Sequence, residues 1–189
     1  MPDPLLFLDV DGVLNPAHPD PDDHFDRHQL LGYTVLLSQR HGEWLRELAG
    51  HYRLVWATTW EEQANLHIAP RLGLPELPVV RFTGYVPQPD DPEVPLLDLF
   101  SGRKWAPIVR YADGRPFAWI DDIIPGSLRR RALPRRDRTL LRVDPGQGLQ
   151  RRHVDRLLAR PPRPALLHRA NLLHRADLLR GRAGGPGPG

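Results

Sequence analysis

Two aspartates separated by one residue, Asp9 and Asp11, are the side chains of this sequence best placed to do chemistry, and Gly12 follows them directly. The apolar residues 5–8 come just before them and have the length and composition of a buried strand. A carboxylate inside such a strand would lose its hydration, so it would need a partner or a shifted pKa. We therefore expect both aspartates where the strand ends and the chain meets solvent or a cation. In open α/β sheets this is the edge that binds ligands.

Further polar residues follow two other apolar runs. Thr58 and Thr59 come after one of them, and Asp121 and Asp122 come after another. If the runs are parallel strands, their carboxyl ends lie at one edge of the sheet and the four aspartates converge. Converging carboxylates repel and raise one another's pKa, a conflict that Mg²⁺ removes by binding carboxylate, water and phosphate oxygens. The sequence thus predicts a magnesium site at this edge, although any one of these acids alone could simply cap a turn.

Lys104 is an independent indication of phosphate chemistry. It is the single lysine among 26 basic residues, and it stands before the second acidic pair. An ammonium is a compact point charge that suits one phosphate oxygen and a neighbouring carboxylate better than the planar fork of arginine does. Its position therefore favours a phosphate-binding role, with chance as the alternative.

Short apolar runs alternate with stretches of helical periodicity along most of the chain. Strands are expected at residues 5–10, 53–57, 77–82, 117–120 and 139–143, and helices at 43–48, 61–72, 104–111 and 149–159. A short extended segment is expected at 33–37 and a Pro- and Asp-rich loop at 16–28. Alternating strands and helices favour parallel pairing with right-handed crossovers. The predicted fold class is α/β, a Rossmann-like three-layer structure around a parallel sheet of about five strands.

The predicted organisation is one domain, residues 1–160, followed by a tail, residues 161–189. Pro161, Pro162 and Pro164 break any helix at this boundary. The tail is rich in Arg, Leu, Pro and Gly, and it nearly repeats a six-residue unit, a period that does not keep leucines on one helix face. We expect the tail to be poorly ordered or weakly helical, and a basic helix that binds a partner is the alternative.

Composition and charge exclude some classes of protein and indicate possible partners. The chain has no cysteine, so it has neither disulfides nor a thiolate metal site. No apolar run approaches the roughly 18 residues of a membrane helix, and no secretory signal pattern is present, so we expect a cytoplasmic protein without a membrane partner. Residues 1–122 hold 19 of the 23 acidic residues, whereas residues 123–189 hold 16 of the 26 basic ones. The basic half is either a solvated surface or a contact for a polyanion such as RNA.

Taken in order, these residues resemble the four motifs of the haloacid dehalogenase-like (HAD) superfamily of phosphatases and phosphotransferases. Those motifs are an Asp-x-Asp-Gly loop, a threonine, a lysine and a terminal acidic pair, and all four occur over roughly residues 5–125. The longer strings at 56–65 and 115–122 look like one subgroup, the HAD domains of Swiss Army Knife RNA repair proteins. The helix expected at 149–159 is similar to that group's final helix, whereas the tail departs from it.

The resemblance implies a catalytic role for both aspartates of the first motif. Asp9 would be the nucleophile that forms an aspartyl-phosphate. Asp11 would be the general acid that protonates the leaving oxygen and then the base that activates water, and an acid at this position favours phosphoryl transfer over dehalogenation. Thr58 and Lys104 would hold the phosphoryl oxygens, with Thr58 preferred over Thr59 because it follows the apolar run at the expected place.

The same resemblance implies how Mg²⁺ would be held. The side chains of Asp9 and Asp121 and the backbone carbonyl of Asp11 would be ligands, and Asp122 would bind the ion directly or through a water molecule. The predicted function is Mg²⁺-dependent hydrolysis of a phosphomonoester. Transfer of the phosphoryl group to an acceptor other than water uses the same residues, and a nucleic-acid-binding or regulatory HAD-like module without turnover is the alternative from another class.

Access to the site indicates the kind of substrate. The segments between the motifs are too short for a large cap domain, so we expect a minimal cap or none, with a small cap from residues 16–38 as the alternative. An open site suits a bulky phosphorylated partner, such as an RNA or DNA end or a phosphoprotein. The tryptophans that flank the motifs are expected to pack in the core rather than to stack on bases; they are Trp56, Trp60, Trp105 and Trp119.

Overall fold

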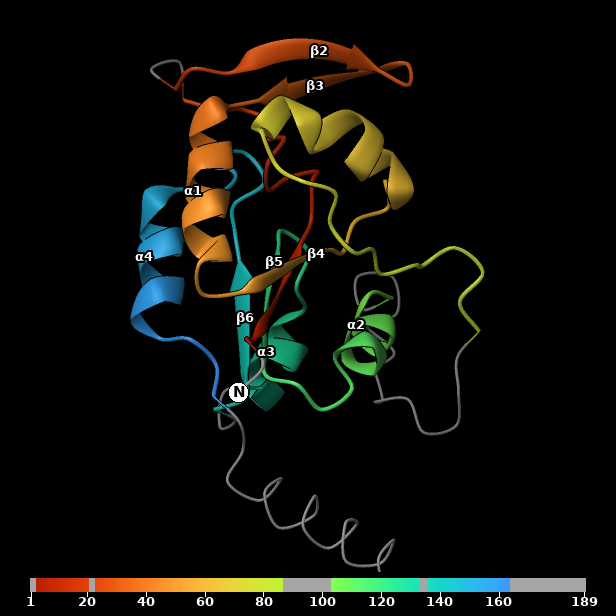
Figure 1. Ribbon diagram of the computed structural model, residues 1–189, viewed down its shortest axis with the longest axis vertical. Coiled ribbons are helices and arrows are strands. Elements are labelled where there is room, and N and C mark those ends of the chain that lie inside the picture. The colour runs from red at the N-terminus through yellow and green to blue at the C-terminus, as the bar shows by residue number, and fades with distance from the viewer. Residues whose placement is uncertain (1–2, 21–22, 87–102, 133–135, 164–189) are drawn as a thin grey trace, which may run out of the picture.

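The core of the protein is a parallel sheet of four strands in the order β4-β1-β5-β6 (Figure 1). The structure is a computed structural model that describes residues 3–20, 23–86, 103–132 and 136–163. Its strands are β1 (Leu5–Leu8), β4 (Arg53–Trp56), β5 (Phe117–Asp121) and β6 (Arg138–Arg142). The two central strands, β1 and β5, are buried along their whole length, which explains why they consist almost entirely of apolar residues. The predicted α/β class and parallel pairing are confirmed.

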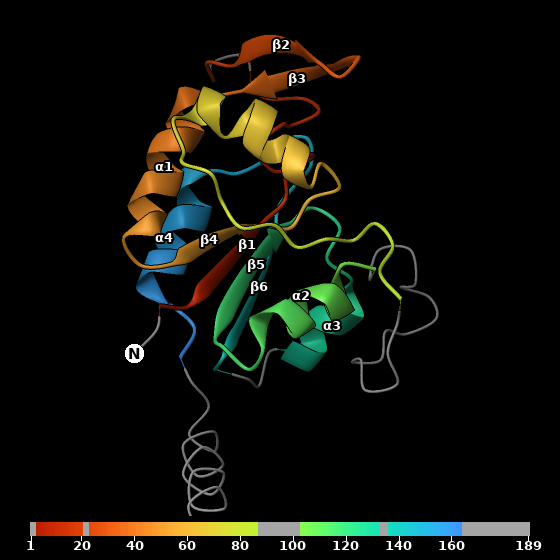
Figure 2. The same ribbon diagram turned by 45° about the vertical axis from the view of Figure 1, so that its right-hand side comes forward.

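Helices cover both faces of this sheet and make the predicted three layers (Figures 1 and 2). Helices α1 (Gln39–Ala49) and α4 (Arg151–Ala159) lie on one face, and α2 (Trp105–Ala112) and α3 (Gly126–Ala132) lie on the other. Alternate residues of β1 point to the two layers, because Leu6 and Leu8 belong to one hydrophobic cluster while Leu5 and Phe7 belong to the other. Helix α3 was not predicted from the sequence.

The strand expected at 77–82 pairs with β4 only through an isolated parallel bridge between Trp56 and Val79. The Trp56 backbone N–H donates to the Pro78 carbonyl at 2.8 Å, and the Val80 N–H donates to the Trp56 carbonyl at 2.9 Å. Pro78 has no N–H of its own, which limits the length of a ladder at this point. The predicted fifth strand is therefore reduced to a single β-bridge beside β4.

Two further segments differ from the expected elements. The region 61–72 is helical but irregular, with a π-helical stretch, η1 (Ala64–Ile68), and a 3₁₀ turn, η2 (Pro70–Leu72), because Pro70 cannot donate to the α-helical pattern. The expected loop 16–28 ends in a strand, β2 (Asp26–Leu30), which pairs antiparallel with β3 (Tyr33–Leu37). This hairpin lies beyond the carboxyl edge of the main sheet, so it is a small insert of the size that the sequence allowed (Figures 1 and 2).

The predicted tail falls largely outside the part of the chain that the structure describes, which ends at residue 163. The last described helix, α4, ends at Ala159, one residue before the predicted end of the domain. Within the described residues, every helix is too short or too polar to cross a lipid bilayer.

Candidate active site

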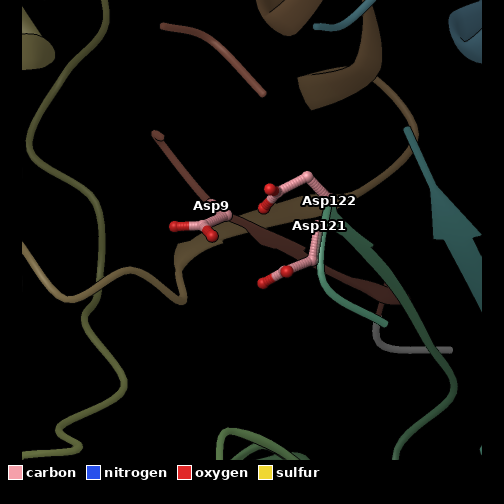
Figure 3. A group of neighbouring side chains, drawn as sticks. All are labelled: Asp9, Asp121 and Asp122. Carbon is pink, nitrogen blue, oxygen red and sulfur yellow. The ribbon is translucent and has the colours of Figure 1, made fainter. Parts of the chain in front are cut away.

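Three carboxylates meet at the carboxyl edge of the sheet. Asp9 follows β1, Asp121 is the last residue of β5, and Asp122 comes next. Because β1 and β5 are neighbours, an oxygen from each carboxylate lies within 4.8 Å of the others, and the three side chains lie together in Figure 3. Carboxylate oxygens at this spacing are the hard ligands that Mg²⁺ prefers. The two acidic motifs, more than one hundred residues apart in the chain, thus form one cluster.

Lys104 lies among these acids, directly before α2. Its Nζ donates to Asp9 Oδ2 at 2.5 Å and to Asp121 Oδ2 at 2.8 Å, and its side chain is only 18% exposed. Burial alone would lower the pKa of Lys104, but the two carboxylates raise it above its ordinary value. Burial raises the pKa of Asp9 to about 7; Lys104 opposes this shift and the charge of Asp121 adds to it. The ionised form of Asp9 is therefore disfavoured even with Lys104 beside it.

The charge balance of the cluster indicates the kind of ion that it can bind. Three ionised carboxylates and one ammonium would place a formal charge of −2 in a largely buried space, which is why burial raises the pKa of Asp9 and Asp122. A divalent cation with oxygen coordination would cancel this charge, and such a cation would replace the hydration that Asp9 and Asp121 have lost. The donor set and the charge of the site thus fit Mg²⁺.

Backbone N–H groups fix the orientation of two of these carboxylates. The Val10 N–H donates to Asp9 Oδ1, and the Ile123 N–H donates to Asp121 Oδ1, each at 2.8 Å. Their other oxygens, both Oδ2, turn toward Lys104. Asp122 is half-buried, and burial together with the charge of Asp121 raises its pKa. The loops after β1 and β5 therefore set the geometry of the cluster.

Gly12 is required where the loop after β1 passes Asp122. Its φ is +70°, and a Cβ added there would lie 2.5 Å from Asp122 Cγ. We expect Gly12→Ala to displace the Asp122 carboxylate and to weaken Mg²⁺ binding by roughly tenfold or more, with a loss of about 1–3 kcal/mol of stability. Calorimetric titration with Mg²⁺ measures the first effect and thermal unfolding the second.

Gly32→Ala is the matched control for that substitution. Gly32 also has a positive φ, +86°, but nothing lies within 4 Å of the position its Cβ would take. It therefore carries the same kind of backbone strain without touching the acidic cluster. Equal Mg²⁺ affinity in both variants would contradict the proposed contact between Gly12 and Asp122.

The sequence predicted that all four aspartates converge, but Asp11 is exposed and its side chain is not part of the group that the other three form. Its Oδ1 accepts a hydrogen bond from Asn15 Nδ2, and its Oδ2 accepts one from Trp60 Nε1, both at 2.9 Å. Neither donor was assigned a functional role from the sequence. Trp56, Trp105 and Trp119 are buried as expected, whereas Trp60 is half-buried and directs its indole N–H to the second aspartate of the first motif.

The two threonines after β4 differ completely in exposure. Thr58 is fully buried, next to the end of β1, while Thr59 is exposed. The turn that separates them from η1 is tight, because the Glu61 N–H donates to the Thr58 carbonyl at 3.1 Å and Glu61 has a φ of +45°. Thr58 therefore faces the interior, where its Oγ1 accepts the Trp60 N–H at 3.4 Å, and Thr59 faces solvent.

Side-chain contacts explain several residues of the string at 56–65. Asn65 Oδ1 accepts hydrogen bonds from Trp56 Nε1 at 2.8 Å and from the Leu77 N–H at 2.9 Å, while its Nδ2 donates to the Leu77 carbonyl. Glu61 Oε1 accepts the N–H groups of Phe82 and Thr83, both at 2.7 Å. The string thus links the turn after β4 to the segment that follows the helical region.

A parallel three-layer α/β fold with this acidic edge defines the HAD-like class of hydrolases. The chain belongs to the family of HAD domains in Swiss Army Knife RNA repair proteins, whose family model matches residues 5–154. No curated protein and no solved structure matches the chain significantly. The matched range includes every residue of the cluster together with Asp11, Thr58 and Lys104.

Proposed function

We propose that this protein is a Mg²⁺-dependent phosphatase that hydrolyses phosphomonoesters through an aspartyl-phosphate. The observation that carries the proposal is the group of three carboxylates and one lysine at the sheet edge, whose formal charge is −2 when all three acids are ionised. Asp9 and Asp121 would bind the ion through their side chains, Asp11 through its backbone carbonyl, and Asp122 directly or through water. The bound ion supplies positive charge that neutralises the phosphoryl oxygens.

Asp9 and Asp11 would carry the covalent steps. A carboxylate oxygen of Asp9 attacks phosphorus and forms the acyl-phosphate bond, while the bond to the leaving oxygen breaks and Asp11 gives that oxygen its proton. Asp11, now a carboxylate, takes a proton from water as the water oxygen attacks phosphorus. The bond to Asp9 then breaks, which releases inorganic phosphate and restores both aspartates.

Lys104 and Thr58 would hold the phosphoryl oxygens. An ammonium has three N–H donors, and two of those of Lys104 are directed to Asp9 and Asp121. The third is available for a phosphoryl oxygen during transfer. Thr58 follows β4, the strand beside β1, and its side chain is fully buried. Both groups would stabilise charge on the phosphoryl group in the transition state.

An RNA or DNA end is the substrate class that we favour. The description of the family supports it, because its members are HAD domains of RNA repair proteins. Among the described residues between β1 and β4, the only insert besides α1 is the short β2–β3 hairpin, which is much smaller than a cap domain. The basic residues that dominate positions 123–189 would suit a polyanion in the cytoplasm.

A phosphate-release screen tests the proposal. We expect Mg²⁺-dependent release from 3′- or 5′-phosphorylated oligonucleotides in preference to nucleotides and sugar phosphates, and loss of release in EDTA. Release from small phosphates alone would contradict the substrate class. Absence of Mg²⁺-dependent release from every substrate would overturn the enzymatic function and would favour a binding or regulatory module without turnover.

A further inference from the structure

The carboxylate of Asp11 is held at both of its oxygens, although the side chain is exposed. The two donors come from different places in the fold, Asn15 from the loop after β1 and Trp60 from the turn after β4. An exposed aspartate without such partners would sample several rotamers. Here one rotamer is selected by two hydrogen bonds of 2.9 Å each.

The Asn15 donor is itself oriented by the hairpin. Asn15 Oδ1 accepts the backbone N–H of Leu36 in β3 at 2.9 Å. Because that partner is a donor, the oxygen of the amide must face β3, and the NH₂ group must face Asp11. The backbone of Asn15 is fixed as well, since its N–H donates to the Val10 carbonyl and its carbonyl accepts the Gly12 N–H, both at 2.9 Å.

The Trp60 donor is fixed by the turn that carries it. The next residue, Glu61, has a positive φ and anchors its carboxylate on the N–H groups of Phe82 and Thr83. The indole ring is half-buried against the hydrophobic core, so it cannot swing freely. Its N–H therefore reaches Asp11 from a rigid support, which is the arrangement that a precisely oriented acid–base group needs.

We propose that Trp60 and Asn15 are positioning residues of the reaction, which hold the Asp11 carboxylate in the orientation that transfers a proton to the leaving oxygen. The inference rests on the proposed phosphatase function and adds two residues to it. Proton transfer matters most when the leaving oxygen is strongly basic, as in an alkyl phosphate, and least for a nitrophenolate. Loss of either donor should therefore affect poor leaving groups selectively, whereas a purely structural role would affect all substrates alike.

Trp60→Phe is the direct test, because it keeps an aromatic ring and removes the indole N–H. We expect kcat/KM, which reports the step that expels the leaving group, to fall about tenfold or more for an alkyl phosphate and less than about threefold for p-nitrophenyl phosphate. Asn15→Ala should show the same selectivity. Trp44→Phe, in α1 and without a bond to Asp11 among the described contacts, is the matched control and should leave both values unchanged.

A second measurement tests the contact without turnover. In the ¹H–¹⁵N spectrum, the Trp60 indole signal, assigned by its absence in Trp60→Phe, should shift in Asp11→Ala while the Trp44 signal stays in place. If the Trp60 signal does not move in Asp11→Ala, the positioning role is wrong. It is also wrong if Trp60→Phe lowers kcat/KM equally for both substrates while the wild type is active, and in both cases the proposed phosphatase function stands. A wild type that releases no phosphate from either substrate would overturn the proposed function, and the positioning role with it.

Discussion

Replacement of Asp9 by asparagine is expected to reduce phosphate release by about three orders of magnitude or more, because an amide oxygen cannot form the acyl-phosphate. The fold should remain intact. The asparagine carbonyl can still accept the Val10 N–H, and Lys104 keeps its bond of 2.8 Å to Asp121. Burial raises the pKa of Asp9, so its charge is itself a cost to the metal-free protein. We therefore expect a melting temperature close to that of the wild type.

Release of p-nitrophenol in saturating Mg²⁺ measures the first effect, and thermal unfolding in EDTA measures the second. Asp113→Asn is the matched control, since Asp113 is exposed at the end of α2 in a left-handed conformation that asparagine tolerates. Acid quenching of the wild type with labelled substrate should trap phosphate on the protein, and the Asp9→Asn variant should trap none. Undiminished turnover in Asp9→Asn would rule out Asp9 as the nucleophile.

The predictable part of this fold is the part that hydrophobic patterning specifies. Strand β1 is apolar at every position because helices cover both faces of the sheet, so the strand could be located from the sequence, although it ends at Leu8, two residues before the predicted end. Strand β2 could not be located in this way. Its sequence Asp-Arg-His-Gln-Leu is mostly polar, and it pairs only with β3 in a two-stranded ribbon that is largely exposed.

In the site, too, the contacts set by strand topology could be predicted from the sequence, and the contacts set by loops could not. Parallel strands bring their carboxyl ends to one edge, so the meeting of Asp9 with Asp121 and Asp122 followed from the fold class. The contact between Trp60 and Asp11 depends instead on a positive φ at Glu61 and on the path of the turn after β4. Periodicity carries no information on such a turn, and a tryptophan is most often a core residue.

Replacement of Lys104 by methionine is expected to change stability, metal affinity and turnover in different directions. Methionine keeps much of the volume but removes the ammonium that bonds Asp9 and Asp121. Their carboxylates are only 8% and 2% exposed, so both would be left buried without their cation. Loss of one partner of a buried ion pair costs about 3–5 kcal/mol, which for a domain of this size lowers the melting temperature in EDTA by roughly 10 °C.

Mg²⁺ should bind the Lys104→Met protein more tightly than the wild type. With all three carboxylates ionised, as they would be around Mg²⁺, loss of the lysine changes the formal charge of the cluster from −2 to −3, and no ammonium competes for the Oδ2 atoms of Asp9 and Asp121. Saturating Mg²⁺ should therefore restore most of the lost melting temperature, since a ligand that binds only the folded state stabilises it. Turnover should nevertheless fall by roughly a hundredfold or more, because the phosphoryl oxygens lose a charged donor in the transition state.

A rise in Mg²⁺ affinity together with a fall in stability and turnover would distinguish Lys104 from a residue that only supports the fold. Thermal unfolding with and without Mg²⁺, calorimetric titration and initial rates measure the three quantities on the same preparations. Arg152→Met removes one positive charge from the exposed face of α4, where Arg152 is not among the charges that shift the pKa of Asp9 or Asp122, and it should leave Mg²⁺ affinity unchanged. Adding Asp9→Asn to Lys104→Met should recover stability in EDTA, because one of the unpaired carboxylates is then gone. Weaker Mg²⁺ binding in Lys104→Met would mean that the lysine organises the acids instead of balancing their charge.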